Sequence, residues 1–157
     1  KASYQSLRDS ALSVSKRPKV MVENMYQGVW YVGGGNSYQA RMIADAGGDY
    51  AWKDDTSTGS LFLSFEQVLD KAEDSDIWLL KVFGTDLTAK GLTEMDSRNR
   101  LFKPFSTGGV YYSNTAVSNL FEEFPFHPEL MLRDYICIFH PTLLSDNNLR
   151  YFNQMKP

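Results

Sequence analysis

The chain has 157 residues, of which 43% are hydrophobic and 14% aromatic, and its formal net charge is −3. This length corresponds to one ordinary domain, and the apolar fraction is sufficient for a buried core, which excludes an intrinsically disordered chain. The near balance of 16 basic and 19 acidic side chains argues against an extended nucleic-acid-binding surface, which is usually basic. The single cysteine, Cys137, excludes a disulfide framework within the chain and a metal site built from several cysteines.

No apolar run approaches the roughly 18 residues that a membrane-spanning helix needs. The chain starts with Lys1-Ala2-Ser3, without an initiator methionine or a secretion signal. We therefore expect it to be a mature or trimmed part of a longer protein.

Short apolar runs alternate with helical patterns along the whole chain. Arg17-Pro18 ends the first helix, because the residue before a proline is pushed out of the α region. Ser64 and Gln67 have the spacing of a capping box at a helix start. The predicted elements, in chain order, are a helix over 4–15, a strand over 19–22, a loop over 23–28, a strand over 29–32, a helix capped by Asn36 or Ser37 and ended by Gly47-Gly48, a polar loop over 53–60, a helix after Ser64, a strand over 77–82, a helix from Thr85 or Asp86 to Met95, an irregular basic segment over 98–109, a strand over 110–112, a helix over 128–139 and a terminal helix over 146–155.

Strands of continuous apolar type, separated by helices, are typical of a parallel α/β fold, in which the sheet is covered on both faces. The run Ile77-Trp78-Leu79-Leu80-Lys81-Val82 is the clearest of these strands. We therefore predict an α/β domain with three α-β-α layers and a mostly parallel, Rossmann-like central sheet.

The triple glycine Gly33-Gly34-Gly35 stands just before a predicted helix, where backbone N–H groups can approach an anion. The segment lacks the later glycine of a dinucleotide fingerprint and the Lys-Ser/Thr pair of a P-loop. The pattern favours a tight turn over a ligand loop, and it argues against nucleotide binding.

No group of residues points to catalysis. His127 and His140 each precede a proline and have no carboxylate or histidine partner at helix-face spacing, so a metal site within this chain is not predicted. Cys137 lies on an apolar helix and is interpreted as a packed thiol. Adjacent carboxylates such as Glu122-Glu123 are interpreted as solvated. We predict no catalytic residue, no metal ligand and no cofactor.

Aromatic residues gather at the ends of the predicted strands. They are Trp30, Tyr31, Phe83, Tyr111 and Tyr112. Ligands bind outside the carboxyl ends of strands in open parallel sheets, so these side chains are candidates for the lining of a cleft. Packing beneath the loops is an equally weighted alternative.

Two groups of charged residues are further candidates for a functional role. Arg98, Arg100 and Lys103 precede the strand over 110–112, and they either meet an anionic ligand or belong to a solvated basic turn. Glu66 lies in the first turn of a predicted helix, where the helix dipole favours a carboxylate without any further role.

Several motifs in series resemble one family. They are Trp30 to Ser37, Ile43 to Gly48, Leu63 to Leu69, Ala72 to Trp78, Gly109 to Tyr112, Pro128 to Asp134 and Ile138 to Pro141. Their order is similar to that in the C-terminal lobe of periplasmic substrate-binding proteins that serve iron-siderophore, haem and vitamin B12 ABC importers. In that family one long helix joins two α/β lobes, and the ligand lies between the lobes.

The resemblance implies that residues 1–17 are the end of the inter-lobe connecting helix and that residues 18–157 are the C-terminal α/β substrate-binding lobe. The N-terminal lobe would then be missing from this chain. Segments after strand ends would face the ligand. The implied ligand-binding residues are Trp30, Tyr31, Gly33, Gly34, Phe83, Arg98, Arg100, Tyr112 and Asn114.

Members of the family dock on their membrane permease through one surface glutamate in each lobe, and the motif around Glu66 places that role on this residue. The resemblance thus implies a non-enzymatic, periplasmic and lipid-anchored component of an ABC importer. Its ligand would be an iron-siderophore, haem or cobalamin-type chelate, which the composition does not separate. Two alternatives stay open: an α/β enzyme lobe of chelatase-like or nitrogenase-component-like topology, and a partner-binding module without a ligand.

Overall fold

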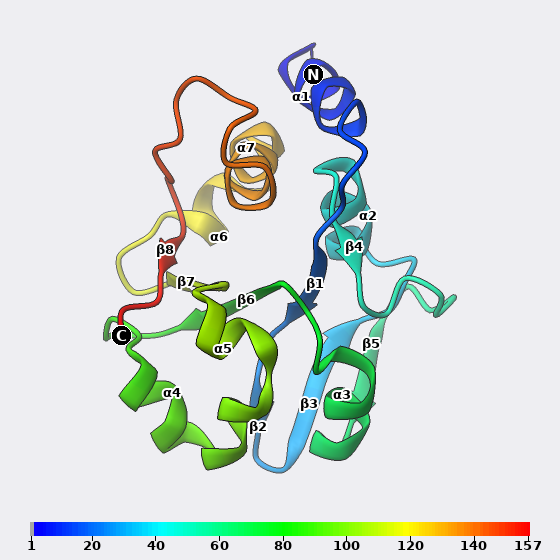
Figure 1. The fold of residues 1–157 in the computed structure, drawn as a ribbon. Coiled ribbons are helices and arrows are strands. Elements are labelled where there is room, and N and C mark those ends of the chain that lie inside the picture. Colours follow the sequence, from blue (N-terminus) through cyan, green and yellow to red (C-terminus); the bar gives the residue numbers. More distant parts are fainter. Residues whose placement is uncertain (1) are drawn as a thin grey trace.

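The computed structural model describes residues 2–157. Helices and strands alternate along most of the chain (Figure 1). The elements are α1 (Ala2–Leu12), β1 (Lys19–Val22), β2 (Met25–Tyr26), β3 (Val29–Gly33), α2 (Tyr38–Asp45), β4 (Asp49–Tyr50), β5 (Ser60–Leu63), α3 (Phe65–Ala72), β6 (Ile77–Val82), α4 (Ala89–Met95), the 3-10 helix η1 (Ser97–Leu101), α5 (Lys103–Thr107), β7 (Val110–Asn114), α6 (Leu120–Glu123), α7 (Pro128–Phe139) and β8 (Asn153–Gln154).

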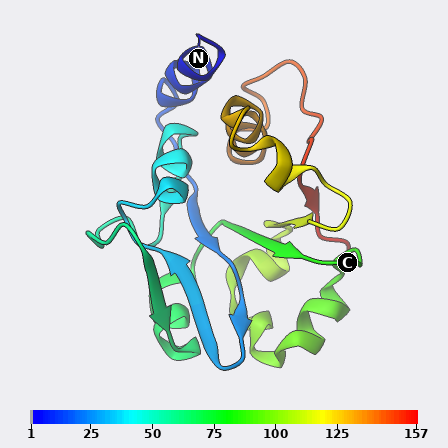
Figure 2. The same cartoon turned by 180° about the vertical axis from the view of Figure 1, so that it is seen from behind.

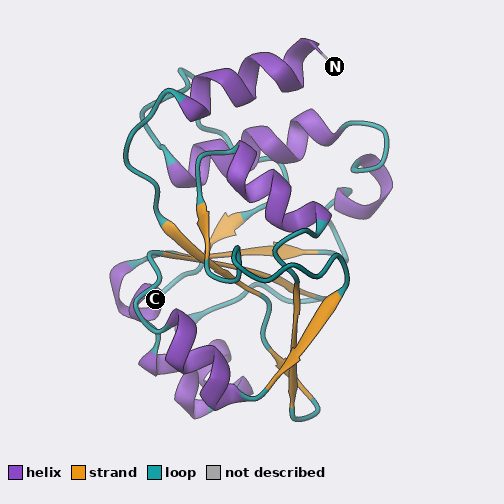
Figure 3. Ribbon diagram, turned by 90° about the vertical axis from the view of Figure 1, so that its right-hand side faces the viewer, coloured by secondary structure: helices purple, strands orange, loops and turns teal. Residues whose placement is uncertain are grey.

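The central sheet has five strands in the order β4-β1-β6-β7-β8. Its strands pair in parallel except β8, which runs antiparallel to β7. The helices α1, α2 and α7 lie on one face of this sheet, and α3, α4 and α5 lie on the other (Figure 1). Figure 3 shows the strands between the two helical layers. The predicted three-layer α/β fold with a mostly parallel sheet is therefore confirmed.

A second sheet, antiparallel and in the order β2-β3-β5, joins the domain on the α3 side. Its three strands were not all expected. The prediction assigned residues 23–28 to a loop, whereas Met25–Tyr26 form β2 as a short hairpin with β3. The polar loop predicted over 53–60 ends one residue early, because β5 begins at Ser60.

The predicted helix starts are confirmed where a capping side chain was identified. The Ser37 side chain accepts the backbone N–H of Ala40 at the start of α2. Ser64 and Gln67 form the predicted capping box at the start of α3. The start predicted for the next helix is wrong: α4 begins at Ala89, because Thr88, and not Thr85 or Asp86, caps it. The segment predicted to be irregular contains η1 and α5.

The helix predicted over 146–155 is also wrong, because this segment is irregular apart from β8. The buried carboxylate of Asp134 accepts the backbone N–H groups of Arg150, Tyr151 and Phe152 at 2.9, 2.7 and 3.3 Å. The Arg133 guanidinium donates to backbone carbonyl groups further upstream in the same segment. These tertiary bonds take the place of the hydrogen bonds that a helix would need.

Four aromatic side chains form what we call the interior aromatic cluster: Trp30, Phe65, Trp78 and Phe102. None of them is more than 3% exposed. The indole N–H of Trp30 donates to the carbonyl of Val22 at 2.9 Å, which satisfies its polar atom. The cluster therefore joins the second sheet to the central sheet and to α3.

The first helix packs on the domain. It contacts α7 and α2, and the Tyr4 hydroxyl donates to Asp45 Oδ2 at 2.8 Å. Within residues 2–157, no helix combines the length and the apolar character that crossing a membrane requires.

Candidate functional site

The topology of the central sheet marks one place as a candidate site. The strands β1 and β6 are neighbours, but the chain continues from β1 to β4 on one side and from β6 to β7 on the other. In open α/β sheets a crevice forms outside the carboxyl ends of strands at such a switch point, and ligands bind there. Glu23 follows β1 at this edge, and Lys81 is the fifth residue of β6.

A pocket of about 250 Å³ lies at this switch point, and we call it the switch-point pocket. The helices that form its walls, α2, α6 and α7, stand on the same face of the central sheet (Figure 2). Its lining is mostly aromatic and aliphatic. The lining residues are Tyr38, Gln39, Met42, Lys81, Leu120, Phe121, Phe124, Met131 and Tyr135.

The outer part of the pocket is an open aromatic rim. Tyr38 and Phe121 are 49% and 59% exposed. The Tyr38 ring meets the Phe124 ring edge to face, with centroids 5.1 Å apart. The guanidinium of Arg41 lies over the Tyr38 ring at 6.0 Å from its centroid. Such a rim offers flat apolar surface to an incoming group.

The inner end of the pocket holds an ion pair. Lys81 Nζ lies 3.0 Å from Glu23 Oε2, and both side chains are about one third exposed or less, at 33% and 27%. The backbone of Glu23 is left-handed, with φ of 67°. Its N–H donates to the Leu79 carbonyl at 2.9 Å, and its own carbonyl accepts the Trp78 indole N–H at 2.7 Å.

A left-handed backbone costs a residue with a side chain roughly 1–2 kcal/mol, and such strain concentrates at functional sites. The two hydrogen bonds to β6 hold Glu23 in this conformation. The sheet therefore fixes the direction from which the Glu23 carboxylate approaches Lys81.

Two buried tyrosines lie near this ion pair. Burial raises the pKa of Tyr50 above its ordinary value, and the neighbouring Glu23 carboxylate raises it further. Burial also raises the pKa of Tyr135, with a smaller contribution in the same direction from Glu23. Both hydroxyl groups are thus neutral near pH 7, and the pair Glu23–Lys81 carries the charge at this end of the pocket.

Three residues predicted to bind ligand are buried in the domain. Trp30 belongs to the interior aromatic cluster, and Tyr112 is 1% exposed. Asn114 is 6% exposed, and its Oδ1 accepts the N–H groups of Gly84 and Ala116 at 3.0 and 3.1 Å. This corrects the expectation for Trp30 and Tyr112, because both occupy inward-facing strand positions with no open surface through which a ligand could contact them.

Two other predicted residues are exposed but lie outside the pocket lining. Phe83, in the turn after β6, is 81% exposed. Tyr31 is 44% exposed on the outer face of the second sheet, where its ring packs edge to face on Phe62 with centroids 5.2 Å apart. Phe83 thus follows the carboxyl end of β6, whereas Tyr31 belongs to another surface.

The triple glycine is explained by the close approach of another chain segment. The N–H of Gly34 donates to the Gly59 carbonyl at 2.8 Å. A side-chain carbon at Gly34 would overlap Ser57, and one at Gly35 would overlap the backbone of Lys53 and Asp55. The loop is therefore a tight turn packed against residues 53–59, as the pattern favoured. Gly33 accepts the Tyr50 hydroxyl at its carbonyl in the same turn.

The structure joins two residues for which the sequence suggested different roles. Arg98 Nη1 lies 3.2 Å from Glu66 Oε2, and its guanidinium stacks over the Phe65 ring at 4.1 Å from the centroid. Asp96 holds the same guanidinium at 2.8 Å. Arg98 thus belongs to the surface around the start of α3, and Arg100 Nε donates to the Ser97 carbonyl. Neither arginine lines the switch-point pocket.

Within residues 2–157, no group of three or more histidine, cysteine or acidic side chains is arranged to hold a metal ion. His140 is buried, its Nε2 lies 3.2 Å from the Gly47 carbonyl, and burial lowers its pKa. His127 lies 3.3 Å from Glu129, a contact that the helix-face spacing did not predict. Cys137 is buried, as expected.

The sequence prediction missed the residues that the structure brings together in the pocket. The missed residues are Glu23, Tyr38, Lys81, Phe121, Phe124 and Tyr135. One signal was available: Lys81 is the charged residue in an otherwise apolar strand, a position that a buried parallel strand rarely gives to lysine. The others lie on four separate segments, and only folding places them around one volume.

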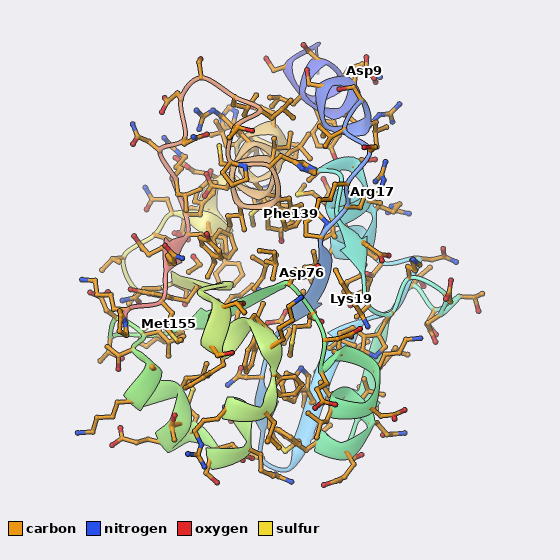
Figure 4. All side chains as sticks on the ribbon, viewed as in Figure 1. Asp9, Arg17, Lys19, Asp76, Phe139 and Met155 are labelled. Carbon is orange, nitrogen blue, oxygen red and sulfur yellow. The ribbon has the colours of Figure 1, made fainter. Side chains whose placement is uncertain are left out.

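A larger hollow of about 740 Å³ lies at the opposite edge of the sheet. Figure 4 labels Asp76, which directly precedes β6, and Phe139, and both residues line this hollow. The carboxylate of Asp76 accepts the backbone N–H of Lys19 at 2.9 Å and the Lys103 ammonium at 2.7 Å. Its oxygens therefore already serve to tie β1, β6 and α5 together.

Comparison with solved structures gives the class of fold: one lobe of a periplasmic binding protein. The chain is similar to the TroA-like periplasmic binding protein FepB from Veillonella parvula, with a TM-score of 0.69 and 17% identity. The match covers 99% of this chain and 54% of that protein. It also matches 53% of the periplasmic heme-binding protein RhuT from Roseiflexus sp. RS-1 over 91% of its own length, with a TM-score of 0.66 and 21% identity.

A third match is S. aureus IsdE complexed with heme, of which 54% is covered by 88% of this chain, with a TM-score of 0.59 and 19% identity. The chain thus spans about half the length of each of these solved structures. The resemblance in fold that the sequence motifs indicated is confirmed.

Among curated proteins, the chain is similar to an uncharacterised lipoprotein of Methanocaldococcus jannaschii. The two are 26% identical over 156 residues, which is 95% of this chain and 36% of that protein. No family model matches the chain.

Proposed function

We propose that residues 18–157 are the C-terminal ligand-binding lobe of the solute-binding protein of an ABC importer, and that residues 1–17 end the helix leading to the other lobe. The ligand is an iron-siderophore, haem or cobalamin-type chelate. The observation that carries the proposal is the open, largely apolar pocket at the switch point of a fold shared with periplasmic binding proteins.

The size of the pocket supports a ligand shared between two lobes. Sites that enclose a whole small ligand usually measure about 300–1,000 Å³. The switch-point pocket measures about 250 Å³ and has an open rim. This lobe would therefore receive one part of a ligand, and a second lobe would cover the rest. Phe83, exposed at the same edge, would contact the ligand outside the pocket.

Glu66 is proposed to dock the lobe on the permease. Its side chain is 78% exposed in the first turn of α3, and Arg98 pairs with it on one side. An exposed, oriented carboxylate can form a two-pronged pair with an arginine of a partner, which provides orientation as well as attraction. The location that goes with this role is the periplasm, with a lipid anchor on the full-length protein, and a lipoprotein relative supports it.

A calorimetric titration of the full-length gene product tests ligand binding. The titrants are haem, the ferric hydroxamate ferrichrome and cyanocobalamin. We expect saturable binding of one of these classes. If none of the three binds, the proposed function is wrong.

An uptake assay tests the docking role separately. Glu66→Arg should reduce uptake of the bound chelate while its affinity for the purified protein stays unchanged. Glu73→Arg is the matched control, because Glu73 is also an exposed glutamate at the opposite end of α3. Equal uptake by the Glu66→Arg and Glu73→Arg variants would exclude docking through Glu66.

A further inference from the structure

The charge at the switch-point pocket comes from one lysine. Of the residues that line this pocket, Lys81 is the one that carries a charge. The arginines from which the sequence suggested anion binding lie elsewhere, since Arg98 is paired at the start of α3 and Arg100 does not reach the pocket. An anionic group that reaches the inner end of the pocket, past the rim where Arg41 lies, would therefore meet Lys81.

The hydrogen-bonding capacity of Lys81 is incompletely used. A lysine ammonium has three N–H donors, and one of them bonds to Glu23 Oε2 at 3.0 Å. The opposite edge of the sheet provides a contrast. There, Lys19 Nζ donates both to Asp74 and to the Lys71 carbonyl, in a cluster of surface ion pairs. Two of its three N–H donors are therefore used within the domain. Lys81 can thus accept a further partner without losing its first one.

Glu23 supplies a counter-ion that the fold itself holds in place. It is absent from the pocket lining but touches the lining residue Lys81. Its left-handed backbone is fixed by hydrogen bonds to Leu79 and Trp78. A lysine beside apolar walls requires a partner, because an unpaired charge in such a place is costly. Glu23 meets that requirement from within the domain.

We propose that Lys81 binds an anionic arm of the ligand and that Glu23 is the internal counter-ion with which this arm competes. This inference rests on the proposed function and assigns its ligand to the chelates that carry carboxylate arms, as opposed to neutral chelates. The pocket volume corresponds to roughly eight water molecules at ~30 Å³ each, which suits one arm. The aromatic and methionine side chains would surround the apolar stem of the arm.

A pair of matched ligands tests the assignment. Haem has two carboxylate arms, and haem dimethyl ester has the same ring with the charges removed. We expect Lys81→Met to weaken haem binding by the full-length protein about tenfold, since a hydrogen bond to a charged group is lost. The same substitution should leave the affinity for the ester unchanged. Lys90→Met, at an exposed lysine on α4, is the control.

Glu23→Gln should act in the opposite direction. Removal of the competing carboxylate should strengthen haem binding severalfold and leave ester binding unchanged. The left-handed backbone tolerates glutamine elsewhere in this chain, at Gln27 with φ of 50°. Glu23→Asn is a second variant if the first one melts at a lower temperature, because asparagine favours this backbone region.

The outcomes separate this inference from the proposed function. Equal loss of haem and ester affinity in Lys81→Met would overturn the anionic-arm assignment, and so would unchanged haem affinity. Binding of ferrichrome or cyanocobalamin without binding of haem would overturn it too, while the proposed function would stand. Failure of all these chelates to bind would reject both.

Discussion

Two groups of aromatic side chains in this domain differ in how far they are exposed to solvent. The interior aromatic cluster of Trp30, Phe65, Trp78 and Phe102 is closed to solvent and lies between the two sheets and α3. The rim of the switch-point pocket presents Tyr38 and Phe121 with about half of their surface exposed.

The two groups are also held in different ways. The cluster is stabilised by mutual packing, with ring centroids 5.1–5.9 Å apart. Phe121 instead lies on the four-residue helix α6, which Glu123 ties to Arg150 by bonds of 2.8 Å. A side chain that supports the fold and one that is free to meet a ligand are therefore distinguished by their surroundings and not by their chemistry.

The largest effect is expected for the cluster. Trp30→Ala should lower the free energy of unfolding by about 3–5 kcal/mol, because it removes a buried indole and leaves a cavity. Urea denaturation measures this loss, and Trp30→Phe should recover part of it. A loss below about 1 kcal/mol would show that Trp30 does not support the core in the way described.

A somewhat smaller loss of stability is expected from the clamp that fixes α7, one wall of the pocket. Asp134→Ala leaves three backbone N–H groups of the C-terminal segment without their acceptor. The free energy of unfolding should fall by about 3 kcal/mol. Burial raises the pKa of Asp134 in spite of these bonds. Desolvation of the carboxylate therefore offsets part of the stabilisation that the three hydrogen bonds provide. Asp134→Asn keeps one acceptor oxygen and should lose less; an equal loss would contradict the role of the N–H bonds.

The rim should respond in binding and not in stability. Phe121→Ala should weaken chelate binding about tenfold, since about 1.4 kcal/mol is what burial of half a phenylalanine side chain contributes. The free energy of unfolding should change by about 0.5 kcal/mol or less. Met95→Ala, an exposed apolar residue on the other helical layer, is the control and should change neither quantity. A large stability loss in Phe121→Ala would remove the distinction between rim and cluster.

The smallest effect concerns the ion pair that positions α6. Arg150 and Tyr151 lower the pKa of Glu123 from its ordinary 4.5 to about 2. A carboxyl whose pKa is lower in the folded state stabilises the fold above its ordinary pKa and loses this contribution as the pH falls. The stability advantage of the wild type over Glu123→Gln should therefore be present at pH 6 and disappear between pH 4.5 and 2. A constant difference in urea denaturation over that range would contradict the pairing.

The elements that were predicted well are those with local determinants. The run at residues 77–82 forms β6, and Ser37, Ser64 and Pro128 begin helices where their capping or φ preferences place them. The elements that were missed depend on distant partners. β8 exists because Asp134 and the edge of β7 hold the C-terminal segment extended.

In the candidate site too, local sequence patterns predicted some features, and contacts between distant residues decided the others. Local pattern could assign aromatic residues to strand ends, but it could not separate Trp30, which faces inward, from Tyr31, which faces outward on the same strand. Arg98, which was expected to face a ligand, pairs instead with Glu66, 32 positions earlier in the chain.

The sequence by itself determined the α/β class, the main strands and helices and the resemblance to a binding-protein lobe, because caps, prolines and apolar runs act within a few residues. Tertiary structure alone decided which aromatic residues are buried and where the charge of the pocket lies. The pair Glu23–Lys81 joins residues 58 positions apart through neighbouring strands, and no local preference specifies that contact.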